Sequence, residues 1–112
     1  GERVEIAPRK DAVREVEERT RGWRAAWRRG EAGDGFIAPE RAASIRKVEL
    51  QEKRVRVTFG PVRALEGPGY VVSWFAQRTA SPDGGAETGV RRLYWEKQGD
   101  GEYRIVGTAW AD

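Results

Sequence analysis

The sequence predicts one α+β domain in which two N-terminal helices pack on a curved four-stranded antiparallel sheet. Three observations lead to this prediction. Apolar residues recur every three or four positions early in the chain, as in a helix, and every second position in the last half, as in strands. Clusters of glycine and proline separate the alternating segments. The helical segments precede the strands within 112 residues, which favours a single domain with helices on one side of a sheet.

The central strand of the sheet is expected at Tyr70–Thr79, the most apolar and aromatic run in the chain. Turn-forming residues bound it at 67–69 and 81–85. Alternation places Ser73, Phe75, Gln77 and Thr79 on one face and Val72, Trp74, Ala76 and Arg78 on the other. Neither face is wholly polar, so we expect both to be covered. A buried amide needs hydrogen-bond partners, which makes Gln77 a candidate for the lining of a cavity.

The first helix is expected to begin at Pro8 or Asp11 and to run to about Arg29. Its apolar stripe consists of Val13, Val16, Thr20, Trp23 and Trp27. Each indole ring can bury on the order of 200 Å². Packing of Trp23 and Trp27 against the sheet is therefore the favoured interpretation, with ligand contact as the alternative.

Residues 1–8 are interpreted as a linker, a frayed edge strand or a vector-derived remnant, so the domain is expected to span 9–112. After the first helix comes a glycine-rich loop to residue 38, whose Phe36 and Ile37 are expected in the core. Pro39 and Glu40 are typical of the first turn of a second helix, whose apolar side would carry Ala42, Ile45 and Val48. The alternation of Val48 with Leu50 leaves a strand open there.

Three further strands complete the expected sheet. The first runs from Arg54 to Leu65, with a bulge or bend at Gly60-Pro61. The third in chain order runs from Val90 to Lys97, with Leu93 and Trp95 on one face and Arg92, Tyr94 and Glu96 on the other. The last runs from Tyr103 to Trp110 after a hairpin turn at 98–101.

The inventory of side chains excludes several kinds of site. The chain has no cysteine and no histidine, which excludes disulfides, thiolate or histidine metal centres and histidine-based triads. Asp34, Asp83 and Asp100 all lie in glycine-rich turns, where turn geometry explains an aspartate. We therefore expect no catalytic residues, no metal and no cofactor.

Charge and hydropathy limit the partners. The net charge is +3, but acidic and basic residues are interspersed, whereas nucleic-acid binders concentrate basic residues in a patch. No window approaches the roughly 18 apolar residues of a membrane span. We expect neither nucleic-acid binding nor membrane insertion.

A strongly bent sheet around a helix leaves a cone-shaped cavity, which is a common ligand site. The side chains that we expect to line it are Trp23, Trp27, Phe75, Gln77 and Trp95. Arg91 is a further candidate, for an anionic group. Because Arg91 and Arg92 are neighbours on a strand they point to opposite faces, and the favoured alternative is one exposed and one half-buried arginine.

Four motifs of the chain are similar to a known pattern: Trp23-Arg-Ala-Ala-Trp27, Phe75-Ala-Gln77, Gly89-Val-Arg91-Arg-Leu93-Tyr-Trp95, and Tyr103-Arg-Ile-Val106 with a closing Trp110. Between Val13 and Trp110 the chain resembles the NTF2-like (SnoaL-like) domains that accompany bacterial L,D-transpeptidases and L,D-carboxypeptidases of the cell wall. The resemblance implies a periplasmic accessory domain without catalysis of its own. It further implies that the domain binds a cell-wall glycan or peptide in its cone, or associates with a partner protein or a second copy through its sheet face.

Two alternatives remain open. One is a free-standing SnoaL-like enzyme, such as an isomerase or hydrolase of a small apolar substrate, which would be indicated by a buried carboxylate beside Gln77 with a raised pKa. The other is an assembly module of a secretion system, with Val72, Trp74 and Arg78 in its interface.

Overall fold

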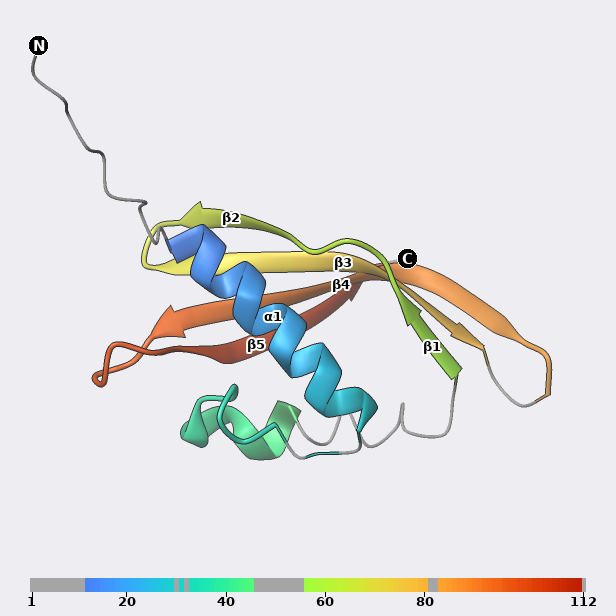
Figure 1. Cartoon of the computed structure of the whole chain (residues 1–112), viewed down its shortest axis with the longest axis horizontal. Coiled ribbons are helices and arrows are strands. Elements are labelled where there is room, and N and C mark those ends of the chain that lie inside the picture. The colour runs from blue at the N-terminus through green and yellow to red at the C-terminus, as the bar shows by residue number, and fades with distance from the viewer. Residues whose placement is uncertain (1–11, 30, 32, 46–55, 81–82, 112) are drawn as a thin grey trace, which may run out of the picture.

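The computed structural model describes residues 12–29, 31, 33–45, 56–80 and 83–111. Its elements are α1 (Ala12–Arg28), the 3-10 turn η1 (Pro39–Arg41) and the strands β1 (Arg56–Phe59), β2 (Arg63–Gly67), β3 (Tyr70–Ala80), β4 (Ala86–Lys97) and β5 (Tyr103–Ala111). All strand pairs of the sheet are antiparallel, and α1 crosses one of its faces (Figure 1). The α+β class is confirmed.

The apolar stripe of α1 packs on the sheet as its helical spacing predicts. Val16, Thr20 and Trp23 are buried, as is Ala26, while Val13 and Trp27 are half-buried. A hydrogen bond also links α1 to β5, because Arg19 Nε donates to the Tyr103 carbonyl at 2.7 Å. The expected starting residues of the helix lie outside the described residues.

The segment after the glycine-rich loop is helical as far as it is described. Ala42–Ile45 continue from η1 as α-helix, and Ile45 is buried. The part of this prediction that concerns Val48, with its strand alternative, lies outside the described residues. Ile37 is buried and forms a parallel bridge with Ile105 of β5. The Ala38 amide donates to the Ile105 carbonyl at 2.9 Å, so this loop covers part of the β5 edge.

The first expected strand is two strands, β1 and β2, which both pair with β3. Phe59 pairs with Gln77 and Arg63 pairs with Trp74. Between these two pairs the β1–β2 segment advances by four residues while β3 advances by three, so the β1–β2 segment has one extra residue. The predicted irregularity at Gly60-Pro61 is thus confirmed, and the expected four strands become five. The interruption has a physical cause, because proline has no N–H to donate to a ladder.

A second irregularity lies between β4 and β5. Tyr94 pairs with Gly107 and Trp95 with Ile105, which leaves Val106 as an extra residue in β5. A bulge of this kind resets which side chains face which side of a sheet. Ile105 before the bulge and Thr108 after it therefore both lie on the side that α1 covers, opposite Trp95 and Leu93 respectively.

The two faces of the sheet differ in burial. On the helix-facing side the buried residues are Val71, Ser73, Phe75 and Gln77 of β3 and Gly89, Arg91, Leu93 and Trp95 of β4. On the outer side Val72 and Trp74 are half-buried, and Ala76 and Arg78 are exposed. The expectation that both faces are covered is wrong for the described part of the chain, because its helical layer lies on one side only (Figure 1).

Gly89→Ala is expected to destabilise the fold by about 1–3 kcal/mol, the usual range for an overpacked site. A Cβ at this position would lie 2.5 Å from Cζ2 of Trp110 and 2.7 Å from the Ala111 carbonyl oxygen, so the backbone of β5 must move. Urea denaturation measures the change. The control is Gly99→Ala in the hairpin turn, where the added methyl meets nothing within 4 Å. Equal stability of the two variants would contradict the close packing of β4 on β5.

Candidate functional site

Trp95 lies at the centre of the domain and is fully buried. Its Nε1 donates to Oγ of Ser73 at 2.9 Å, and the hydroxyls of Ser73 and Thr20 are hydrogen-bonded at 2.8 Å. The Thr20 hydroxyl in turn donates to the Val16 carbonyl at 2.7 Å. This chain of hydrogen bonds joins β4, β3 and α1. Trp95 is therefore a core residue, and its hydrogen bond to Ser73 is part of the link between the sheet and α1.

Gln77 and Arg91, each 2% exposed, meet on the helix-facing side of the sheet. Arg91 Nε donates to Gln77 Oε1 at 3.0 Å, and its Nη1 donates to Oγ1 of Thr108 at 3.1 Å. The Gln77 amide nitrogen lies 3.4 Å from Oγ1 of Thr79. The partner that the Gln77 side chain requires is thus a buried guanidinium. The expectation of a half-buried Arg91 is wrong, because these neutral oxygens allow its complete burial.

The remaining predicted site residues are aromatic and belong to the same core. Phe75 and Trp27 both pack against Phe59, edge to face, with centroid distances of 5.2 and 5.8 Å. Nε1 of Trp27 is buried and has no hydrogen-bond partner among the described residues. Trp23 is buried and lies beside Gly33 of the loop.

The six predicted site residues are therefore distributed through the core. The described contacts join Gln77 to Arg91 directly, and Trp27 to Phe75 through Phe59. Trp23 and Trp95 have their contacts elsewhere, at the loop and at Ser73. Trp23, Phe75 and Trp95 belong to the hydrophobic core cluster, and Trp27 packs against it.

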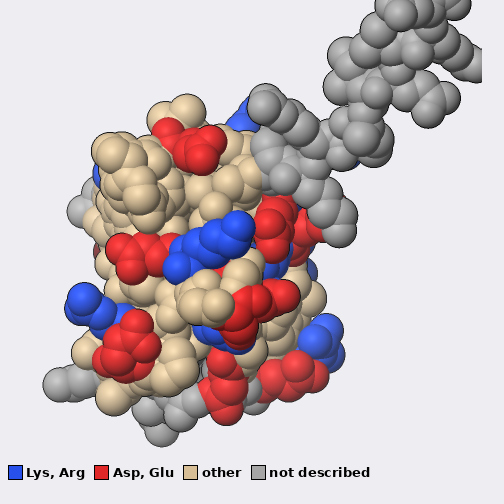
Figure 2. Space-filling view, turned by 90° about the vertical axis from the view of Figure 1, so that its left-hand side faces the viewer, with Lys and Arg blue, Asp and Glu red and all other residues tan. Residues whose placement is uncertain are grey.

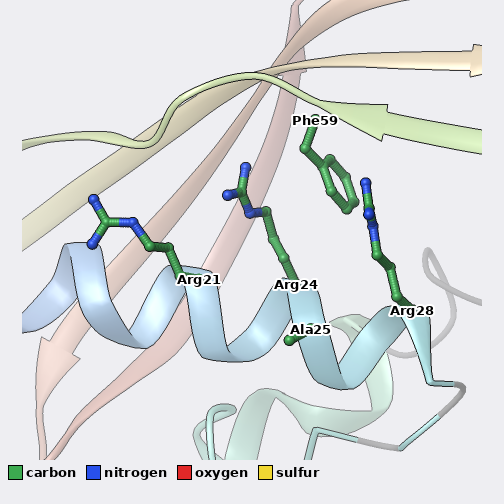
Figure 3. Close-up of a pocket in the computed structure, with 5 residues that line it drawn as sticks. All are labelled: Arg21, Arg24, Ala25, Arg28 and Phe59. Atoms are coloured by element: carbon green, nitrogen blue, oxygen red, sulfur yellow. The ribbon is translucent and has the colours of Figure 1, made fainter.

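An open groove of about 300 Å³ lies between α1 and β1 and is lined by Arg21, Arg24, Ala25, Arg28 and Phe59. Figure 3 shows Phe59 pointing from β1 toward the helix, between the side chains of Arg24 and Arg28. Phe59 has the Arg24 guanidinium 5.1 Å and the Arg28 guanidinium 4.9 Å from its ring centroid, within cation–π distance. The groove thus has an aromatic wall and a cationic rim.

The three arginines of the groove lie on one face of α1, because their spacings of three and four residues correspond to one helical turn each. Arg24 Nη1 donates to the Gly60 carbonyl at 2.7 Å, which places this guanidinium under the β1–β2 break. Burial lowers the pKa of Arg24, and the neighbouring charges of Arg28 and Arg21 lower it further. The positive charges of the groove therefore repel one another.

Carboxylates balance this charge only in part. Glu17 lies 3.5 Å from Nη2 of Arg21. Arg28 is exposed, and no carboxylate of the described residues pairs with it. The sequence interpretation missed these residues. A signal was present, since Glu17 stands four residues before Arg21, whereas the corresponding positions before Arg24 and Arg28 hold Thr20 and Arg24.

Two aspartates of the described residues have structural roles in turns. Asp100 accepts from the Glu102 amide at 3.0 Å and pairs with Arg104 at 2.7 Å, and these contacts, that with Arg104 first, lower its pKa. Asp83 accepts from the Gly85 amide at 3.1 Å. Both aspartates are turn residues, as predicted. Figure 2 shows acidic and basic side chains interspersed on one face of the molecule.

The described residues show neither a metal site nor a membrane-spanning helix. They contain no group of three or more carboxylate, histidine or cysteine side chains that could hold a metal ion. None of their helices is long and apolar enough to cross a membrane.

Gln77→Ala is expected to cost about 2–4 kcal/mol of folding free energy, because it leaves the buried Nε of Arg91 without its acceptor and opens a cavity. Gln77→Glu retains an acceptor opposite the Arg91 guanidinium and is expected to lose less folding free energy than Gln77→Ala. Gln98→Ala, in the hairpin turn, is the control and is expected to change stability by less than about 1 kcal/mol. Chemical denaturation measures all three. A Gln77→Glu variant less stable than Gln77→Ala would contradict this role of Gln77.

A solved structure has a fold similar to that of this chain. No family model matches the chain, and no curated protein matches it. Among solved structures, the protein Bd1075 of Bdellovibrio bacteriovorus is similar, with a TM-score of 0.58 and 20% sequence identity. The similarity covers 88% of this chain and 39% of Bd1075, so this chain spans well under half the length of that protein. At this identity the likeness concerns the fold: an α+β domain of the same architecture forms part of a larger protein in Bdellovibrio.

Proposed function

We propose that this chain is a non-catalytic accessory domain, NTF2-like in fold, of a protein that acts at the bacterial cell envelope. Its role is to bind a peptide or glycan fragment of the cell wall and to leave covalent chemistry to another part of the protein. It works in the periplasm and uses no cofactor. The observation that carries the proposal is the groove of Arg21, Arg24, Arg28 and Phe59.

The chemistry of this groove suits binding. Guanidinium groups keep their protons at neutral pH, so they hold an anion without exchanging a proton with it. Phe59 and the Gly60 carbonyl orient two of the three guanidiniums before any ligand arrives. Preorganised donors lower the entropic cost of binding. The described hydrogen-bond partners of Gln77 are Arg91 and Thr79, and neither is the buried carboxylate that would indicate an enzyme.

The cell-envelope part of the proposal rests on the sequence motifs, which resemble those of domains attached to L,D-transpeptidases and L,D-carboxypeptidases. The coverage of Bd1075 supports an accessory role, because there too the matching fold occupies only 39% of the chain.

Purified peptidoglycan fragments are expected to bind the domain saturably and to change its tryptophan fluorescence. Trp27 contacts Phe59, the aromatic wall of the groove, at a centroid distance of 5.8 Å and should report on occupancy. The control is a chito-oligosaccharide of equal length, which has the glycan but no peptide stem. If no fragment binds at millimolar concentration to folded protein, the cell-wall role is wrong.

A second candidate role, association through the outer face of the sheet, is favoured by an apolar patch. Leu65, Val72 and Tyr94 are neighbours in register across β2, β3 and β4, and Tyr70 packs beside Tyr94 at 6.1 Å between centroids. Leu65 is 62% exposed and Tyr70 is 37% exposed. Such a patch suits a second copy of the chain or the face of a partner in an assembly.

If the outer face mediates dimerisation, Leu65→Glu should convert the dimer to a monomer, because it places a charge at the centre of the patch. The fold should stay intact, since Leu65 is mostly exposed within one chain. Sedimentation velocity at several concentrations measures the change. Arg63→Glu, on the same strand and also exposed, is the charged control. A wild-type monomer at all concentrations would contradict self-association.

A further inference from the structure

We propose that the groove between α1 and β1 binds the carboxylate group of a short acidic peptide, held by Arg24 and Arg28. This inference rests on the proposed function and deepens it, because it names the ligand class and the residues that recognise it.

The groove has an excess of positive charge that the described residues do not neutralise. Arg24 has a carbonyl partner and Arg28 an aromatic partner, but neither pairs with a carboxylate of the described residues. Like charges at this separation repel, and an anion between them relieves the repulsion. Burial of part of Arg24 lowers the local dielectric constant and strengthens its attraction for an anion.

The guanidiniums also have donors to spare. A guanidinium carries five N–H groups, and the described contacts of Arg24 use one of them, toward Gly60. Arg28 stacks on Phe59 and uses none in a described hydrogen bond. Stacking restricts the side chain while leaving its N–H edge open, which is the arrangement that binds carboxylates with two hydrogen bonds.

The size of the groove limits the ligand to a short segment. A volume of about 300 Å³ is at the lower end of the range for small-molecule sites. Polyanions such as nucleic acids would also meet the acidic side chains Glu17 and Glu18, one turn before the groove on α1. A ligand with one local negative charge avoids this repulsion.

Among single anions, a carboxylate is the one for which the described residues give a precedent on this helix face. The side chain of Glu17 already pairs with Arg21 at 3.5 Å, so the helix face presents its guanidiniums to a carboxylate within the molecule itself. A peptide carboxylate one turn further along would make the equivalent contact with Arg24 and Arg28. The competing source of the same charge is inorganic phosphate, which the test includes.

The experiment titrates the 112-residue protein with two blocked tripeptides, acetyl-Ala-Glu-Ala-amide and acetyl-Ala-Gln-Ala-amide, by calorimetry at low salt. The glutamate peptide should bind at least roughly tenfold more tightly than its neutral isostere, because charge-assisted hydrogen bonds are the strong ones. Arg28→Gln should lose that difference, and Arg28→Lys, which keeps the charge without the planar fork, should lose part of it.

Arg78→Gln is the matched control. It removes the same charge from an exposed arginine on the outer face of the sheet and should leave binding unchanged. Circular dichroism checks that each variant is folded. Equal binding of the two peptides, equal loss in Arg28→Gln and Arg78→Gln, or tighter binding of inorganic phosphate than of the glutamate peptide would each overturn the carboxylate assignment. Absence of binding at millimolar peptide would do the same.

The outcomes separate this inference from the proposed function. If the glutamate peptide binds through Arg28 but peptidoglycan fragments do not bind, the groove recognises acidic peptides and the cell-wall role is wrong. If peptidoglycan fragments bind and Arg28→Gln binds them as well as wild type, the accessory role stands and the groove is not its site.

Discussion

The hydrogen-bonded chain from Trp95 through Ser73 to Thr20 is the contact on which the rest of the domain depends. It is fully buried and joins two strands to the helix. An apolar interface alone would allow α1 to slide, whereas a buried donor without its acceptor costs on the order of 1–3 kcal/mol. The chain therefore sets the position of α1 along the sheet. Everything further along the helix, including the groove at its C-terminal half, takes its position from this link.

Arginine serves two purposes in this domain, because the surroundings of Arg91 and Arg28 differ. Arg91 is surrounded by neutral oxygens from Gln77 and Thr108 and is completely buried, so it acts as part of the core. Arg28 is exposed, lies against the face of Phe59 and makes no described hydrogen bond. A guanidinium that is already satisfied holds strands together. One that is oriented and has no hydrogen-bond partner among the described residues is available to a ligand, which makes the surface groove a candidate site.

Much of the fold could be predicted from the residues, and the candidate site could not. Alternation in β3 correctly grouped Ser73, Phe75 and Gln77, and the need of a buried amide correctly marked Gln77. Its partner Arg91 was noticed separately, but nothing in the sequence states that the two side chains meet. Phe59 lies within the strand expected at Arg54–Leu65, and the sequence assigns it no role in a site. Its importance depends on α1 passing over β1, which the spacing of residues does not encode.

The sequence by itself determined the local structure: which segments are helix or strand, which side chains share a face, and where Gly60 and Pro61 interrupt an edge strand. These features depend on neighbouring residues, so short-range periodicity and backbone geometry suffice. Only the tertiary structure decided that the Gln77 amide meets Arg91, that Val106 shifts the β5 register, and that Arg24 reaches the Gly60 carbonyl 36 residues away. Contacts of that kind depend on the angle and register at which α1 crosses the sheet, and those are set by the packing of the whole core.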